Sequence, residues 1–168
     1  ALYHVLDLLK RTLGLHTCVL LMRDDTSGRL RIVELATDGD DVAEGPFDPR
    51  EGAVGAVASR GLTMNLENLK PGYKGLCYYR GGALVRCFLG VPVEEGGQVR
   101  GALCADRLED APFTAREEEI VRSAVAQALR AIQNERIFVQ LEASKREQTH
   151  LYRASQALGE ALTEDQVI

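Results

Sequence analysis

The chain has 168 residues, of which 45% are hydrophobic and 27% are charged, and its formal net charge is −5. This composition is typical of a folded globular protein and excludes a disordered or fibrous one. Because the basic residues are interleaved with acidic ones, and because no apolar run approaches the ~20 residues of a membrane span, we expect neither nucleic acid nor a membrane as a partner.

The first expected elements are a helix and a β-hairpin. Residues 1–13 carry leucines at helical spacing, and Gly14 follows as a natural helix end. Two apolar runs, 18–23 and 29–36, are joined by a loop of turn-forming residues that ends in Gly28. Such a pair of extended runs around a short turn predicts an antiparallel hairpin.

The middle of the chain predicts a short helix, a short strand and a long loop. Asp48 is placed to cap the helix and Pro49 to occupy its first position, and Gly61 ends it. Residues 62–66 predict a short strand. Residues 67–84 then contain four glycines and one proline and predict a loop. Loops of this length are uncommon in compact domains and often bind ligands.

A second hairpin follows, formed by residues 85–95 and 98–108 around a Gly96-Gly97 turn. Pro92 has no N–H to donate, so it predicts an edge position or a bulge in the first of these strands.

The last expected element is a long helix. Thr114 and Glu117 form a capping box, and no proline or glycine interrupts the sequence until Gly159, so the helix is predicted from residue 114 to about residue 150. A four-three spacing then predicts the seam of a coiled coil. The seam positions are Ile137, Leu141, Ser144, Gln148, Leu151, Ser155, Leu158 and Leu162. A solvated helix with coincidental leucines remains the alternative, because some of these positions are polar.

The cysteines, Cys18, Cys77, Cys87 and Cys104, sit in or beside apolar runs, and no two have the spacing of a zinc or redox pair. They predict reduced, mostly buried thiols and a cytoplasmic protein. The histidines are spread along the chain without ligand spacing, so the sequence predicts no metal site, and we assign no catalytic residue.

A cluster of aromatic and basic residues in and after the long loop is the strongest candidate for ligand binding. It combines rings for stacking with guanidinium groups for anions, which suits a small planar or anionic ligand. Its members are Tyr73, Cys77, Tyr78, Tyr79, Arg80 and Arg86. The alternative is that the tyrosines simply cover the sheet.

Three segments together resemble a GAF domain, a small-molecule-sensing module of phosphodiesterases, adenylyl cyclases, sensor kinases and transcriptional activators. They are GAVGAVASRGLTMNLENL, RCFLGVPVEEGGQVRGALCADR and APFTAREEEIVRSAVAQALRAIQNERIF. The resemblance implies an α+β fold over residues 1–140, with a central antiparallel sheet of about six strands. Helices would pack on one face, and a ligand cavity would lie on the other, under the long loop.

The resemblance also implies a non-catalytic regulatory domain of a larger signalling protein. Its terminal helices would pair with those of a second copy in a homodimer and relay the signal to an output domain in the same chain. Residues 141–168 would be a linker helix and the truncated start of a following domain. The ligand itself is not identified. The candidate ligand-binding residues are Asn65, Tyr73, Cys77, Tyr78, Tyr79, Arg80, Arg86, Phe88, Cys104 and Asp106.

The sequence departs from several GAF subfamilies. The Asn-Lys, Phe and Asp-Glu motif of cyclic-nucleotide-binding members is missing, and so are the cysteine motifs of bilin-binding members. The methionine-sulfoxide-reducing members carry a cysteine where this chain has Val54. Two alternatives to a ligand sensor remain: a ligand-free dimerisation and relay scaffold, and a thiol reductase that uses Cys77 with Cys87 or Cys104.

Overall fold

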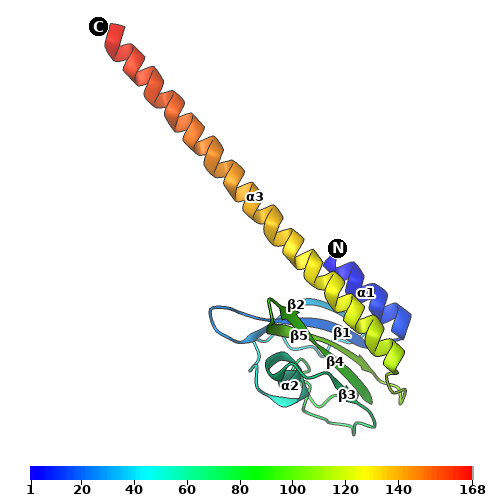
Figure 1. Ribbon diagram of the computed structural model, residues 1–168. Helices are drawn as coiled ribbons and strands as arrows, with labels where there is room; N and C mark the ends of the chain where they lie inside the picture. The colour runs from blue at the N-terminus through cyan, green and yellow to red at the C-terminus, as the bar shows by residue number, and fades with distance from the viewer. Residues whose placement is uncertain (168) are drawn as a thin grey trace. The chain divides into compact units, whose positions relative to one another are not determined.

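A computed structural model describes the backbone of residues 1–167 and the side chains of residues 1–162. The elements are α1 (Leu2–Leu13), β1 (Thr17–Arg23), β2 (Leu30–Thr37), α2 (Gly52–Arg60), β3 (Met64–Leu66), β4 (Cys87–Glu95), β5 (Gln98–Arg107) and α3 (Ala115–Val167) (Figure 1). Contacts divide the chain into two units, Ala1–Leu129 and Arg130–Ile168, and the described backbone of the second unit belongs entirely to α3.

The strands form one antiparallel sheet in the order β2-β1-β5-β4-β3. This confirms the α+β class and both predicted hairpins, because β1 pairs with β2 and β4 pairs with β5. The sheet has five strands among the described residues, one fewer than the resemblance implied. The long loop adds only isolated bridges, which pair Tyr73 with Ala83 and Tyr79 with Val42.

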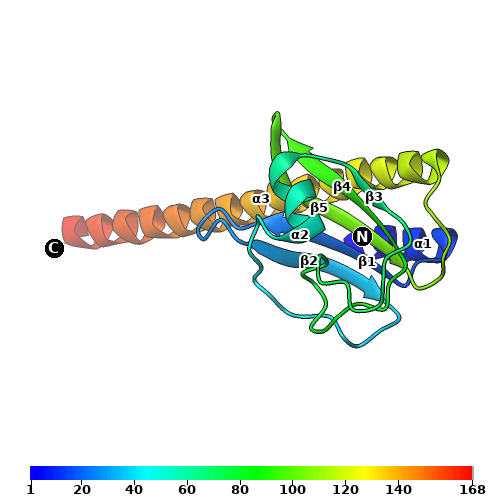
Figure 2. The ribbon, with the colours of Figure 1, turned by 90° about the horizontal axis from the view of Figure 1, so that it is seen from below.

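The two faces of the sheet bury alternate residues of each strand. Val19 of β1 lies opposite Cys104 of β5 on one face, and Leu20 lies opposite Leu103 on the other. Helix α2 and the long loop pack on the first face, in the same apolar cluster as Val19 and Cys104. Helix α1 and the first turns of α3 cover the second face (Figures 1 and 2). The expectation that the helices share one face is therefore wrong for α2.

Helix α2 begins at Gly52, later than Asp48 predicted. The carboxylate of Asp48 accepts a hydrogen bond from the N–H of Arg50 at 2.9 Å, so it forms a turn before the helix instead of capping it. The carbonyl of Gly75 accepts a hydrogen bond from the N–H of Ala53 at 3.0 Å. A Cβ on Gly52 would lie 2.5 Å from that carbonyl oxygen, so the close approach of loop and helix requires glycine.

Pro92 lies where β4 has no partner strand on the side of β3 among the described residues. Strand β3 pairs with β4 only as far as Gly90, and the register of β4 shifts between Val93 and Glu94. The missing N–H of Pro92 therefore removes no hydrogen bond to β3. Of the two predicted alternatives, the structure shows the edge position for Pro92, and the bulge lies just after it, between Val93 and Glu94.

Helix α3 begins with the predicted capping box. The N–H of Glu117 donates to Oγ1 of Thr114 at 3.1 Å, and the N–H of Thr114 donates to Oε1 of Glu117 at 3.0 Å. The helix continues through Gly159, beyond its predicted end near residue 150. The large apolar residues of the predicted seam are all exposed: Ile137, Leu141, Leu151, Leu158 and Leu162. Their pairing with another helix stays a prediction.

A membrane span requires a long and strongly apolar helix. The described helices contain no segment that meets this requirement.

Candidate functional site

Asp106, the penultimate residue of β5, has a fully buried carboxylate (0% exposed). Its Oδ1 accepts a hydrogen bond from the N–H of Thr17 at 3.1 Å. Its Oδ2 accepts hydrogen bonds from the hydroxyls of Tyr78 at 2.8 Å and Tyr79 at 2.6 Å. No ion pair among the described residues includes this carboxylate. Hydrogen bonds from neutral groups therefore hold the buried charge.

The network extends from Asp106 across β1 to the end of β2. The hydroxyl oxygen of Tyr79 lies 2.9 Å from Oγ1 of Thr17, which lies 2.7 Å from Oγ1 of Thr37. A phenol has one proton, so when Tyr79 donates to the carboxylate it accepts a hydrogen bond from Thr17. The N–H of Gly39 donates to Oγ1 of Thr37 at 3.1 Å. Each donor in this chain polarises the next, which strengthens the bonds to the carboxylate.

Burial raises the pKa of Asp106 from 3.8 to about 6, and the hydrogen bonds from Tyr79, Tyr78 and Thr17 oppose this rise. Burial and the nearby charge of Asp106 also raise the pKa of both tyrosines. At neutral pH the tyrosines therefore keep their protons and donate them to an ionised carboxylate.

A cavity of about 660 Å³ lies beside this network, between the segment 46–51 and the part of the long loop from Lys74 to Gly82. Tyr79 belongs to both structures, because it is one of the residues that line the cavity and its hydroxyl contacts Asp106. The charged residues of the lining are Arg29, Lys74, Arg80, Asp48 and Glu51. The lining thus carries one more basic than acidic group, an arrangement that favours a ligand with an anionic group.

The predicted ligand-binding residues divide between the cavity and the core. Those that line the cavity are Cys77, Tyr79 and Arg80. Those that are fully buried and outside the lining are Tyr78, Phe88, Cys104 and Asp106. The alternative interpretation, that the tyrosines cover the sheet, is therefore right for Tyr78, whereas Tyr79 covers the sheet and also faces the cavity.

The remaining predicted residues also lie outside the cavity lining. The amide of Asn65 donates to the carbonyl of Phe113 at 3.0 Å. The guanidinium of Arg86 lies 3.8 Å from the carboxylate of Asp110. Tyr73 is half-buried and packs against the core cluster that contains the long loop. Nothing in the structure brings these three side chains to the cavity.

Sequence reasoning missed the segment that forms the opposite wall of the cavity. This segment contains Asp48 and Glu51 and is held beside β2 by a bridge between Leu30 and Phe47, whose N–H groups donate to each other's carbonyls at 2.9 and 2.8 Å. Such a pairing depends on residues far apart in the sequence. The one local signal was the group of charged residues around Pro49, which we interpreted as a helix start.

The cysteines form no disulfide among the described residues, and all but Cys77 are buried, as the sequence predicted for mostly buried thiols. Burial raises the pKa of Cys77 to about 12 and raises the pKa of Cys104 well above its ordinary value. Neither thiol is ionised at neutral pH, so neither has the environment of a nucleophilic cysteine. No group of potential metal ligands comes together in the part of the chain that the structure describes.

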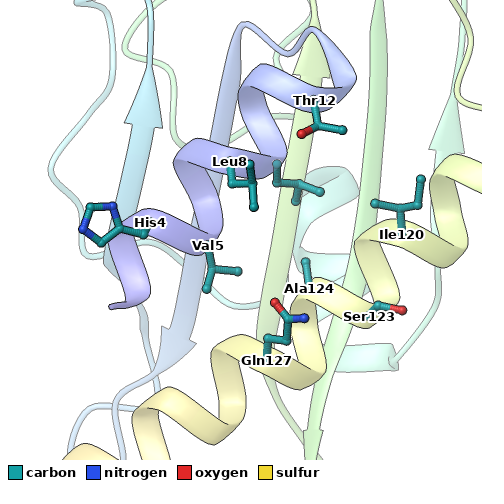
Figure 3. A pocket seen from close by; sticks show the side chains of 9 residues that line it. His4, Val5, Leu8, Thr12, Ile120, Ser123, Ala124 and Gln127 are labelled. Carbon is teal, nitrogen blue, oxygen red and sulfur yellow. The ribbon is translucent and has the colours of Figure 1, made fainter.

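A second hollow, of about 420 Å³, lies between α1 and the start of α3 within the first unit. Val5 and Thr12 of α1 and Ala124 and Gln127 of α3 border the same groove (Figure 3). Leu8, also in the lining, is 61% exposed. The groove is largely apolar and separated by the sheet from the cavity near Tyr79.

This fold has counterparts among known proteins. A model of the GAF domain family matches residues 1–132. The comparison with curated proteins found no match. Among solved structures, the chain is similar to the GAF domain of a phosphoenolpyruvate-protein phosphotransferase from Acinetobacter, with 23% identity, a TM-score of 0.64, and coverage of 82% of this chain and 85% of that chain.

Two further solved structures are similar. The GAF domain of a phosphoenolpyruvate-protein phosphotransferase from Coxiella burnetii has 24% identity and a TM-score of 0.65, covering 81% of this chain and 84% of that chain. A type II free methionine-R-sulfoxide reductase from Thermoplasma acidophilum has 16% identity and a TM-score of 0.62, covering 75% of this chain and 85% of that chain. At these identities the likeness shows the fold alone.

Proposed function

The chain belongs to the GAF domain family, and from this premise we propose that it is a non-catalytic sensory domain of a larger signalling protein. Its small ligand binds in the cavity lined by Cys77, Tyr79 and Arg80 and carries an anionic group. Binding changes the packing of α1 and α3, which relay the signal to an output domain in the same full-length chain.

The observation that carries this proposal is the position of Tyr79. It lines a cavity of about 660 Å³, and its hydroxyl is hydrogen-bonded to the buried carboxylate of Asp106. A ligand that fills the cavity contacts a residue whose hydroxyl is part of the buried hydrogen-bond network of Asp106. A bound ligand can therefore act on the core through Tyr79, whereas a ligand in a groove without such a residue cannot. The basic groups of Arg29, Lys74 and Arg80 account for the preference for an anion.

Native mass spectrometry of the purified chain and thermal unfolding with a panel of small carboxylates and phosphorylated metabolites test the proposal. We expect at least one compound to raise the midpoint of unfolding, because a ligand that binds only the folded state stabilises it. Arg80→Gln should weaken that shift. Arg116→Gln, which removes an exposed arginine of α3 outside the cavity lining, should leave it unchanged. A panel without any shift, together with a spectrum without bound ligand, contradicts a sensory role.

The exposed apolar seam of α3 favours a second candidate, a dimerisation and relay scaffold that binds no ligand. Ile137, Leu141, Leu151, Leu158 and Leu162 recur at coiled-coil spacing and are exposed in a single chain. The homodimer is compatible with both candidates. The metabolite panel separates the two, since only the sensor responds to it.

An enzyme, a thiol-based methionine sulfoxide reductase, is the candidate that we disfavour. Cys77 lines the cavity, as the nucleophile of such an enzyme would. Its pKa of about 12 argues for the non-catalytic proposal, because the reactive species is the thiolate.

A further inference from the structure

The last two residues of β5, Asp106 and Arg107, have side chains on opposite faces of the sheet. In the pairing of β5 with β4, Asp106 lies opposite Phe88, on the face of the sheet that α2 and the long loop cover. Arg107 lies opposite Cys87, on the face that α1 and α3 cover. Both side chains are buried. Two adjacent residues thus place one buried charged group on each face of the sheet.

On the first face, Asp106 accepts hydrogen bonds from both tyrosines of the long loop. The distances are 2.8 Å from Tyr78 and 2.6 Å from Tyr79. The same carboxylate holds the N–H of Thr17 at the start of β1 at 3.1 Å. A displacement of Tyr79 by a ligand therefore acts on the position of Asp106.

On the second face, the guanidinium of Arg107 joins both terminal helices. Its Nε lies 3.1 Å and its Nη2 lies 2.6 Å from the carbonyl oxygen of Leu13, the last residue of α1. Its Nη1 donates to the carbonyl of Ala111 at 2.9 Å, and it forms an ion pair with Glu117 in the first turn of α3. The guanidinium also lies 4.2 Å from the ring centroid of Phe113.

Glu117 is the point at which Arg107 meets the start of α3. Its Oε1 accepts the N–H of Thr114 in the capping box at 3.0 Å. The hydrogen bond from Arg107 holds the pKa of Glu117 below its ordinary value, and the N–H of Thr114 and the charge of Arg107 add to this effect. A movement of Arg107 therefore alters the helix cap and the end of α1 together.

We propose that the Asp106–Arg107 pair is the positioning element that couples the ligand cavity to the terminal helices. The proposal rests on the sensory function proposed above and names the residues that transmit it. Residues 101–106 of β5 pair with β1 and residues 101–107 pair with β4, so this end of the strand moves with the sheet rather than by itself. A displacement of Tyr79 then shifts Asp106, and the adjacent Arg107 shifts with it and alters the contacts with Leu13 and Glu117.

Amide hydrogen exchange of the full chain without any ligand tests this coupling. Tyr79→Phe removes one hydrogen bond to Asp106, and we expect exchange in residues 115–119 and 11–15, on the opposite face, to become about fivefold faster. Tyr73→Phe removes a hydroxyl from the same loop that does not reach Asp106, and it should leave those segments unchanged. The central residues of β2 serve as an internal reference for global unfolding.

Coupling between two sites is reciprocal, so a substitution at the start of α3 must also change the exchange of the long loop. Glu117→Gln should accelerate exchange in residues 76–80 of the long loop, whereas Glu119→Gln, at an exposed position of the same turn, should not. Changes confined to the face of the substituted residue in both variants, with both proteins folded by circular dichroism, overturn the proposal. This result is independent of the metabolite panel, so failure of the coupling and failure of ligand binding are distinguishable.

Discussion

The hydroxyl oxygen of Tyr79 lies 2.6 Å from Oδ2 of Asp106, so a residue that lines a surface cavity donates its only hydroxyl proton to a buried carboxylate. The same carboxylate has no cationic partner among the described residues and depends on such donors. A ligand that moves the ring of Tyr79 must lengthen this hydrogen bond or move β5 with it.

Tyr79→Phe should lower the free energy of unfolding by about 1–3 kcal/mol, because a buried carboxylate loses one of its donors. The measurement is urea unfolding followed by circular dichroism at neutral pH. The control is Tyr73→Phe, whose hydroxyl makes no hydrogen bond to Asp106. Equal losses in the two variants would show that the hydroxyl of Tyr79 has no special role.

Asp106 should make the protein less stable as the pH rises. Between its ordinary pKa of 3.8 and its folded pKa of about 6, the folded state binds the proton more tightly than the unfolded chain. The free energy of unfolding therefore falls as the pH rises through this window, and Asp106 adds no further change above it. The full effect is on the order of 3 kcal/mol.

Asp106→Asn cannot titrate, so it isolates this contribution. We expect its stability relative to the unsubstituted protein to increase from about pH 3.5 to about pH 7. Asp110→Asn, at an exposed position close in sequence, is the matched control and should show no such trend. A constant difference between the Asp106 variant and the parent over this range would mean that the carboxylate has an ordinary pKa.

The cysteines should be inert in the folded protein. With a pKa of about 12, the thiol of Cys77 stays protonated at pH 7, and Cys104 is fully buried. A thiol reagent such as dithionitrobenzoate should react slowly with the native chain and rapidly with the chain in guanidinium chloride. One fast-reacting native thiol, lost in Cys77→Ser, would instead favour the reductase.

The seam of α3 should mediate self-association. Leu158→Glu places a charge within the apolar seam, where the partner helix would bury it, and should shift the chain toward the monomer in sedimentation experiments. Ala157→Glu places the same charge one residue away, on the far side of the helix. A monomeric parent protein, or equal dissociation of both variants, would contradict the coiled coil.

Local patterns in the sequence predicted the hairpins and the helix cap well. The Gly96-Gly97 turn, the loop of turn-forming residues that ends in Gly28, and the pair Thr114 and Glu117 are signals that depend on neighbouring residues only. They were sufficient for the strand pairing of β1 with β2 and of β4 with β5. The family resemblance supplied the sheet as a whole, with one strand too many.

The site was predicted less well because its walls meet through distant contacts. The composition of the long loop indicated a ligand site, and Tyr79 and Arg80 do line the cavity. Asp48 was interpreted as a helix cap because the sequence does not show that Gly75 fills that role from the loop. Phe88 was expected at the ligand, but the alternation of β4 directs it into the core beneath the tyrosines.

The contact of Gly75 with α2 limits how this domain can be re-engineered as a biosensor. The carbonyl of Gly75 lies where a Cβ on residue 52 would need to be, and it accepts the N–H of Ala53. A loop transplanted from a related domain to change ligand preference would lose this cap unless its own backbone supplied a carbonyl at the same place. The long loop and the first turn of α2 should therefore be exchanged together, as one cassette.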